Sequence, residues 1–181
     1  GGEWRLAGAG NETVPGVRLR LVQPNIPQNQ KWKQELRRGH VLKQLELSNR
    51  PAPSGLSPTH VIWAETAVPF VVSGPGTDPS PLTQAIGRAA PPGGFVIVGA
   101  PRSAGAGTAS KKLFNSLLAI DSDGRIKDAY DKHHLVPFGE YVPLRSVLPV
   151  EKLTAGRQDF SPGPGVRTID LDGLPAFSPL I

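Results

Sequence analysis

The sequence predicts an α/β fold built around a sheet that contains both parallel and antiparallel strands. In the first hundred residues, short apolar segments typical of strands alternate with segments that have helical spacing. From residue 113 onward, strand-like segments occur in two pairs, and a short glycine-containing turn joins the two segments of each pair. Strands separated by a helix usually pair in parallel, whereas strands joined by a tight turn pair antiparallel. The sequence therefore predicts a mixed sheet with helices packed against it.

The first predicted elements are a strand, a helix and a second strand. Residues 17–22 alternate between arginines and apolar side chains, which is the pattern of a strand; the apolar set is Val17, Leu19 and Leu21. Residues 31–49 carry apolar side chains at roughly helical spacing and predict an amphipathic helix. Residues 60–63 form a short apolar run that is consistent with a buried strand.

A second helix and a third strand follow. Residues 80–90 begin with a serine–proline pair, which suits a helix N-terminus, and their apolar residues recur at intervals of three and four. Residues 95–99 form another apolar run and predict a buried strand. With the preceding elements, this completes the alternation of strands and helices.

Two hairpins are predicted in the remainder of the chain. Residues 113–121 and 125–130 flank the turn sequence Ser-Asp-Gly, and residues 167–171 and 174–177 flank Asp-Gly. Both are strong hairpin signals. Residues 1–16 are rich in glycine and polar residues and predict a linker ahead of a domain over residues 17–181.

The composition narrows the classes of function. The chain has no cysteine, so it contains neither a disulfide nor a thiolate metal site, and the adjacent histidines His133 and His134 would point to opposite sides of an extended chain. We therefore expect no metal and no cofactor. The net charge of +5 suits an anionic membrane surface, whereas nucleic-acid binding is disfavoured because no basic run is interleaved with aromatic residues. No apolar run approaches the ~20 residues that span a bilayer.

Two segments carry the chemistry. Glu65, in the sequence VIWAETAVPF, follows a predicted buried strand, where a partly desolvated carboxylate can act as a general base. Lys132, in the sequence DKHHLVPFGEYVP, follows another strand, and its ammonium could stabilise a developing oxyanion. The alternatives are a structural carboxylate that caps a loop and an ordinary solvated lysine.

Two further residues are candidates beside this pair. Glu140 either orients Lys132 or acts as a second carboxylate, and the alternative is a surface charge. Trp32 either anchors the helix that its segment predicts, which is the favoured interpretation, or forms the wall of a pocket for an apolar substrate.

In order along the chain, these segments resemble the carbon–nitrogen hydrolase (nitrilase) superfamily, and more narrowly its apolipoprotein N-acyltransferase branch. The resemblance extends over residues 17–181, and four segments carry it: 22–32 (VQPNIPQNQKW), 61–69, 114–116 (FNS) and 130–143. The sequence HLVPFGE after the lysine is specific to this branch. Phe114 replaces the usual tyrosine, and Ala64 replaces a common proline.

The resemblance implies a fold and a set of roles. The fold would be a layered α-β-β-α sandwich with mixed sheets, of which residues 17–181 are the N-terminal part. Glu65 would be the base, Lys132 the oxyanion-stabilising cation, Glu140 a second required glutamate, and Trp32 an aromatic residue near the substrate path. The family's third catalytic residue is a cysteine, expected just beyond the second hairpin. We therefore expect the chain to stop short of its nucleophile and to be inactive as given.

The resemblance also implies substrates and a location. A cysteine thiolate would take an acyl chain from a membrane phospholipid as a thioester, and the N-terminal diacylglyceryl-cysteine of an apolipoprotein would receive it. The expected location is the periplasmic side of a bacterial inner membrane, to which missing transmembrane segments would attach the domain, with no nucleic acid involved. Two alternatives remain: a soluble amidase of the same superfamily, and a non-catalytic binding module with the same fold.

Overall fold

A five-stranded mixed sheet forms the centre of the protein. In the computed structural model, residues 2–10, 12–52, 55–105, 112–143 and 159–179 are described. The strands lie in the sheet in chain order: β1 (Leu19–Val22), β2 (His60–Trp63), β3 (Val96–Ala104), β4 (Lys112–Ile120) and β5 (Ile126–Asp131). β1, β2 and β3 pair in parallel, and β3, β4 and β5 pair antiparallel. The predicted mixed sheet and the predicted hairpin of β4 and β5 are confirmed.

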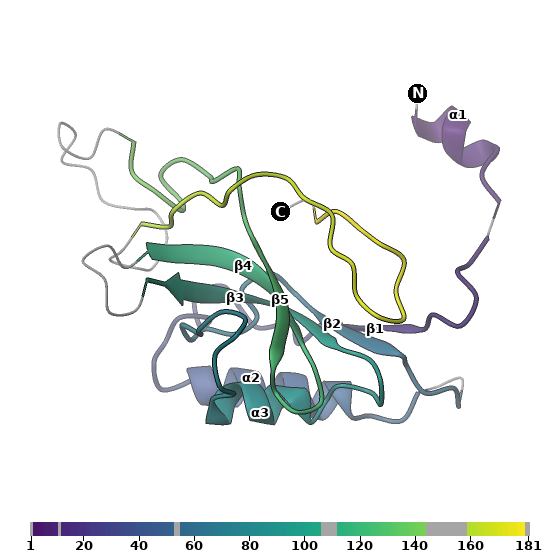
Figure 1. The fold of residues 1–181 in the computed structure, drawn as a ribbon, viewed down its shortest axis with the longest axis horizontal. Helices are drawn as coiled ribbons and strands as arrows, with labels where there is room; N and C mark the ends of the chain where they lie inside the picture. The colour runs from purple at the N-terminus through teal and green to yellow at the C-terminus, as the bar shows by residue number, and fades with distance from the viewer. Residues whose placement is uncertain (1, 11, 53–54, 106–111, 144–158, 180–181) are drawn as a thin grey trace.

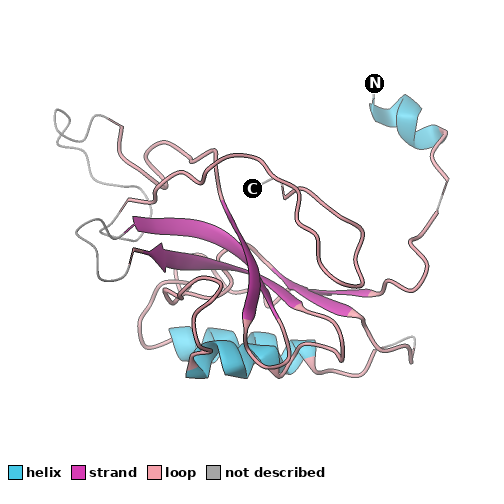
Figure 2. Cartoon of the chain, viewed as in Figure 1, coloured by secondary structure: helices cyan, strands magenta, loops and turns pink. Residues whose placement is uncertain are grey.

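Two helices cover one face of this sheet, as Figures 1 and 2 show. They are α2 (Arg37–Ser48) and α3 (Pro81–Gly87). Ser80 caps the N-terminus of α3. Its hydroxyl accepts from the backbone N–H of Thr83, while the Thr83 hydroxyl accepts from the backbone N–H of Ser80. This reciprocal cap explains why the helix starts at the serine–proline pair. The core between helices and sheet includes Val61, Trp63, Val96, Val98, Leu118 and Ile120.

The helix α2 differs from the prediction in its start and in its buried face. Residues 31–36 form turns, and the helix begins at Arg37. Its buried side chains are His40, Val41, Gln44 and Ser48, whereas Leu42 is 56% exposed. The Ser48 hydroxyl donates to the carbonyl of Gln44 at 2.7 Å and accepts from the Trp63 indole at 2.8 Å, so this buried hydroxyl is paired.

The opposite face of the sheet is covered by the chain segment of residues 159–179, which Figure 1 draws in yellow-green to yellow. A second core cluster forms there from Phe95, Ile97, Ala119, Tyr130, Ile169 and Leu171. The predicted second hairpin is present only as a single bridge, in which Ile169 and Phe177 exchange two backbone hydrogen bonds. The chain reverses at Asp172-Gly173 as predicted, but the two flanking strands do not form.

The edge strand β1 has the alternation that the sequence predicts, but its apolar side does not face a core. Leu19 is 50% exposed and Leu21 73% exposed, while Val22 packs beneath the helices. Arg20, on the same side as Val22, donates to the backbone oxygen of Ser48 at the end of α2. Among the described residues, β1 is therefore covered only on the face that packs against the helices.

The N-terminal residues, which the sequence predicts to be a linker, include one short helix. Residues Gly2–Ala7 form the short helix α1, and none of its side chains is buried. Figure 1 shows it standing apart from the sheet. Within the described ranges, no helix has both the length and the apolar character needed to cross a bilayer.

Candidate active site

Three charged side chains that the sequence singles out meet in one cluster. The ammonium nitrogen of Lys132 lies 3.3 Å from Oε1 of Glu65 and 3.3 Å from Oε2 of Glu140. The side chains of Lys132 and Glu140 are 11% and 13% exposed, whereas that of Glu65 is 50% exposed. One largely buried cation is thus shared by two carboxylates. Their convergence is observed, and their catalytic roles remain predictions.

Glu65 lies in a tight turn that follows β2 at the carboxyl end of the parallel strands. The backbone N–H of Ala67 donates to the carbonyl of Ala64 at 3.2 Å and closes this turn. Thr66 has φ +51°, a left-handed conformation that is uncommon for a β-branched residue. Strain of this kind persists only where the surrounding contacts enforce it. The turn of residues 64–67, called the base-bearing turn because Glu65 is the predicted base, is therefore a fixed element of the site.

Lys132 is held where β5 ends. Its backbone N–H donates to the carbonyl of Asn115 on β4 at 2.8 Å, and its own carbonyl accepts from Gly163 at 2.9 Å. The preceding residue, Asp131, points to the other face of the sheet. There it accepts two hydrogen bonds from Arg102, at 2.9 and 2.6 Å, and one from the Ser116 hydroxyl at 2.6 Å. This buried network joins β3, β4 and β5 directly beneath the lysine.

Glu140 reaches the cluster from the loop that follows Lys132. Its backbone N–H donates to the carbonyl of Val136 at 2.8 Å, and its Oε2 accepts from the Val136 backbone N–H at 2.8 Å. Phe138, between them, has φ +61°. The loop therefore folds back on itself, and the carboxylate of Glu140 is one of the groups that closes it.

Asn115 completes the cluster, and the sequence reasoning did not select it as a site residue. Its side-chain nitrogen donates to Oε1 of Glu65 at 2.8 Å and to Oε1 of Glu140 at 2.7 Å. The residue is 3% exposed. The available signal was the polar pair Asn115-Ser116 inside the otherwise apolar segment 113–120, because a buried amide in a strand needs polar partners. Asn115 uses its two N–H groups to join the two carboxylates.

The electrostatics of the cluster favour a charged lysine. Burial lowers the pKa of Lys132, but the carboxylates of Glu65 and Glu140 together outweigh burial, so this pKa lies above its ordinary value. Two carboxylates face one ammonium, so the cluster carries an excess negative charge when all three groups are ionised. Such a site holds its cation firmly and has a carboxylate available for proton transfer.

The two carboxylates differ in which oxygens are engaged. Both oxygens of Glu140 accept hydrogen bonds, Oε1 from Asn115 and Oε2 from the Val136 backbone. Glu65 uses only Oε1, which accepts from Asn115 and Lys132. Among the contacts of the described residues, Oε2 of Glu65 has no donor. That oxygen is the one able to accept a proton from a reacting group.

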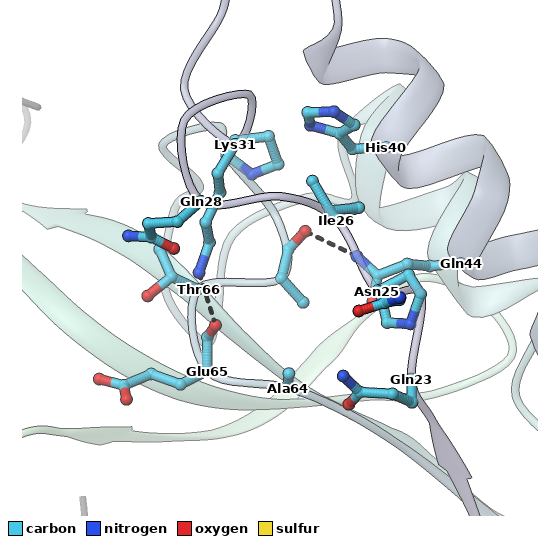
Figure 3. Close-up of a pocket in the computed structure, with 13 residues that line it drawn as sticks. Gln23, Asn25, Ile26, Gln28, Lys31, His40, Gln44, Ala64, Glu65 and Thr66 are labelled. Atoms are coloured by element: carbon cyan, nitrogen blue, oxygen red, sulfur yellow. Dashed lines mark hydrogen bonds between the residues drawn. The ribbon is translucent and has the colours of Figure 1, made fainter.

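Lys31 and a polar cavity lie behind the base-bearing turn (Figure 3). The ammonium of Lys31 donates to the backbone carbonyl of Glu65 at 3.2 Å, and burial lowers the pKa of Lys31, an effect that the charge of Glu65 partly opposes. The cavity of about 140 Å³ is lined by residues including Asn25, Lys31, His40 and Gln44. Figure 3 shows the Glu65 carboxylate directed away from these groups, toward the other side of the turn.

The remaining predicted site residue, Trp32, takes no part in the hydrogen bonds and ion pairs of the cluster. It is half-buried, its carbonyl accepts from Arg37 at 3.4 Å, and it precedes α2 instead of lying within it. Its predicted role in substrate binding remains a prediction. Within the described ranges, no group of three histidine or acidic side chains is placed to hold a metal ion.

Comparison with known proteins identifies the family. Residues 18–171 match the carbon–nitrogen hydrolase family. The chain belongs to this family. It is 33% identical over 98% of its length to an apolipoprotein N-acyltransferase of Rhodopseudomonas palustris, and 35% identical over 93% to that of Bradyrhizobium diazoefficiens. It covers 34% and 32% of these proteins, so the chain spans about a third of the length of the relatives it matches.

Solved structures of carbon–nitrogen hydrolases share the fold. XC1258 from Xanthomonas campestris, a CN-hydrolase superfamily protein, superposes with a TM-score of 0.55 over 87% of this chain and 50% of its own, at 20% identity. Nit3 from Saccharomyces cerevisiae, a nitrilase-superfamily member, gives 0.54 over 86% of this chain and 52% of its own, at 18% identity. The predicted nitrilase-like α/β fold is confirmed. The resemblance inferred from the glutamate and lysine segments is confirmed at the level of the family and of the similar N-acyltransferases.

Proposed function

We propose that this chain supplies the base and the cation of an N-acyltransferase that moves an acyl chain from a phospholipid to an apolipoprotein. The observation that carries the proposal is the cluster of Glu65, Lys132, Glu140 and Asn115, in which one carboxylate oxygen is left without a donor. The nucleophile would be a cysteine outside these 181 residues, which contain none. The chain would act as part of a longer protein that carries this residue.

In the first step, a cysteine thiol gives its proton to Oε2 of Glu65, and the thiolate attacks the carbonyl carbon of the phospholipid ester. The negative charge that develops on the carbonyl oxygen is stabilised by the ammonium of Lys132, which the cluster holds charged. The intermediate collapses to a thioester. The departing lysophospholipid takes the proton from Glu65, so the base is regenerated.

In the second step, the α-amino group of a diacylglyceryl-cysteine attacks the thioester carbonyl. Glu65 accepts the proton that the amine loses and delivers it to the departing cysteine sulfur. Lys132 again faces the oxygen that becomes negative. Glu140 and Asn115 do not exchange protons in this scheme; they hold Lys132 and Glu65 in place.

The substrate class is supported by the relatives' names and by the surface around the cluster. Relatives that match 98% and 93% of this chain are named apolipoprotein N-acyltransferases. Two apolar side chains on the loop between Lys132 and Glu140 are exposed: Val136 at 52% and Phe138 at 36%. Exposed apolar groups beside a reactive centre suit an acyl chain and would limit access of water to a thioester. We propose the periplasmic face of a bacterial inner membrane as the location.

The proposal is tested by replacing Lys132 in the longer protein that carries the cysteine. We expect Lys132→Met to lower the rate of lysophospholipid release by at least about 10²-fold, since the developing oxyanion loses its stabilising charge. Lys127→Met is the matched control, because Lys127 lies on β5, the strand that Lys132 follows, and is exposed. Wild-type transfer by the Lys132 variant, or loss of transfer by both variants, would remove the proposed role.

The alternative within the same family is an amidase, because the charged cluster does not by itself select an ester over an amide. The same purified protein, given small amides and water in place of phospholipid and lipopeptide, separates the two functions. Transfer of an acyl chain to an amine supports the proposal. Hydrolysis of amides with no acyl transfer would assign the amidase function instead.

A further inference from the structure

The direction of the Glu65 carboxylate depends more on the position of its backbone than on packing of its side chain. The side chain is 50% exposed and is held only at Oε1. By contrast, the side chain of Glu140 is 13% exposed, with both oxygens engaged. A half-exposed glutamate has several accessible rotamers, so its carboxylate is placed accurately only if its Cα is placed accurately. Whatever fixes the base-bearing turn therefore fixes the proposed base.

The backbone of this turn packs directly against Gly99 on β3. A Cβ atom at Gly99 would lie 2.7 Å from the Cα of Glu65 and 2.9 Å from the carbonyl oxygen of Ala64, and still closer to the backbone nitrogen of Thr66. All three neighbours are backbone atoms, which cannot move aside as a flexible side chain would. The carbonyl of Gly99 also accepts from the N–H of Val68 at 3.1 Å. The absence of a side chain lets the turn rest directly on the sheet.

Gln44 on α2 holds the same turn from the cavity side. Its side-chain nitrogen donates to the carbonyl of Ala67 at 2.7 Å, as the dashed line in Figure 3 shows. Gln44 is fully buried, and its Oε1 has no hydrogen-bond partner among the described residues. A buried amide with one unpaired atom is unfavourable for stability, and an apolar side chain of this size would avoid that cost. The amide is therefore better explained by its contact with the turn than by core packing.

We propose that Gly99 and Gln44 are positioning residues for Glu65: they hold the backbone of residues 64–67 so that Oε2 of Glu65 points at the reacting thiol. This inference rests on the proposed function. Neither residue contacts the substrate in this scheme. Both act through the turn, one by leaving room for it against β3 and the other by a hydrogen bond across the cavity.

The first test is Gly99→Ala in the longer protein that carries the cysteine, assayed by single-turnover formation of the acyl-enzyme. Displacing the turn by about 1 Å is expected to slow acylation by about 10²-fold, while the KM for phospholipid changes little. Gly39→Ala is the matched control, because a Cβ at Gly39 on α2 meets nothing within 4 Å. The control is expected to acylate at the wild-type rate.

The second test is Gln44→Met, which keeps the volume and removes the donor. Acylation is expected to fall by about 10-fold, in line with the loss of one contact that orients the base. The melting temperature should change little, because the variant removes the unpaired Oε1 while leaving the carbonyl of Ala67 without its donor. A residue with only a structural role would shift the melting temperature without slowing the folded enzyme.

The outcomes separate this inference from the function on which it rests. If Glu65→Gln blocks acylation but folded Gly99→Ala and Gln44→Met both acylate at the wild-type rate, the positioning role is wrong. If Gly99→Ala does not fold, Gln44→Met decides alone. If Glu65→Gln itself acylates normally, the proposed function fails.

Discussion

Two segments each bring one glutamate to Asn115 and Lys132: the base-bearing turn, residues 64–67, and the lysine loop, residues 132–142. The two glutamates differ in burial and in how many of their oxygens accept hydrogen bonds. Glu140 is buried, and both of its oxygens accept hydrogen bonds within the protein. Glu65 is half-exposed and engages one oxygen only. Asn115 and Lys132 contact both carboxylates. This difference is the basis on which we propose Glu65 for proton transfer and Glu140 for support.

The largest effect on turnover is expected from Glu65→Gln. The glutamine can keep its oxygen toward Asn115 and Lys132 and place its NH₂ group where Oε2 has no donor, so the fold should be retained. The base is lost, and general-base catalysis contributes about 10²–10⁴-fold. Acyl-enzyme formation, followed by intact mass, should fall by about that factor at an unchanged melting temperature. Normal accumulation of the thioester would exclude Glu65 as the base.

A smaller loss of activity with a larger loss of stability is expected from Glu140→Gln. Because both oxygens accept from donors, an NH₂ group at either position faces another donor. Leaving buried polar groups unpaired costs about 1–3 kcal/mol, so the melting temperature should fall and Lys132 should be less firmly held. Thermal unfolding compared with Glu65→Gln tests the contrast. Equal stability of the two variants would mean that the two glutamates are not distinguished as described.

The smallest effect is expected from Asn115→Leu, which removes the donor that the two carboxylates share. Lys132 still contacts both groups, so acyl-enzyme formation should fall only about 10-fold, a modest loss of orientation. The stability cost should fall mainly on Glu140, since water can replace the amide at the half-exposed Glu65. A double variant with Glu140→Gln would show this as a non-additive loss of stability. Additive losses of stability would show that Asn115 does not support Glu140.

The sequence was sufficient for the parts of the site that follow regular elements. Glu65 is the second residue after β2 and Lys132 directly follows β5, and the pairing of β2, β3, β4 and β5 brings these strand ends to one edge of the sheet. The turn Ser-Asp-Gly placed the β4–β5 hairpin because glycine at residue 124 adopts φ +78°. These features depend on local sequence and on strand order, which a pattern can predict.

The parts that the sequence could not supply depend on contacts between distant segments. Asn115 and Gln44 look like polar interruptions of a strand and a helix until the fold places acceptors 50 and 23 residues away in sequence beside them. The same reason explains the buried polar face of α2. The second predicted hairpin gave only one bridge because packing of Ile169 and Leu171 on the sheet positions that segment, not strand pairing.

The most direct measurement of the central claim is the pKa of Lys132, obtained by NMR titration of protein labelled at the lysine side chains. We predict that this pKa lies above the ordinary value for a lysine side chain, and that Glu65→Gln and Glu140→Gln each lower it. A raised pKa means that the ion pairs stabilise the fold below the ordinary lysine pKa and that this contribution is lost as the pH rises through the raised value. A Lys132 pKa at the ordinary lysine value, with neither variant changing it, would contradict the shared cluster on which the proposed chemistry depends.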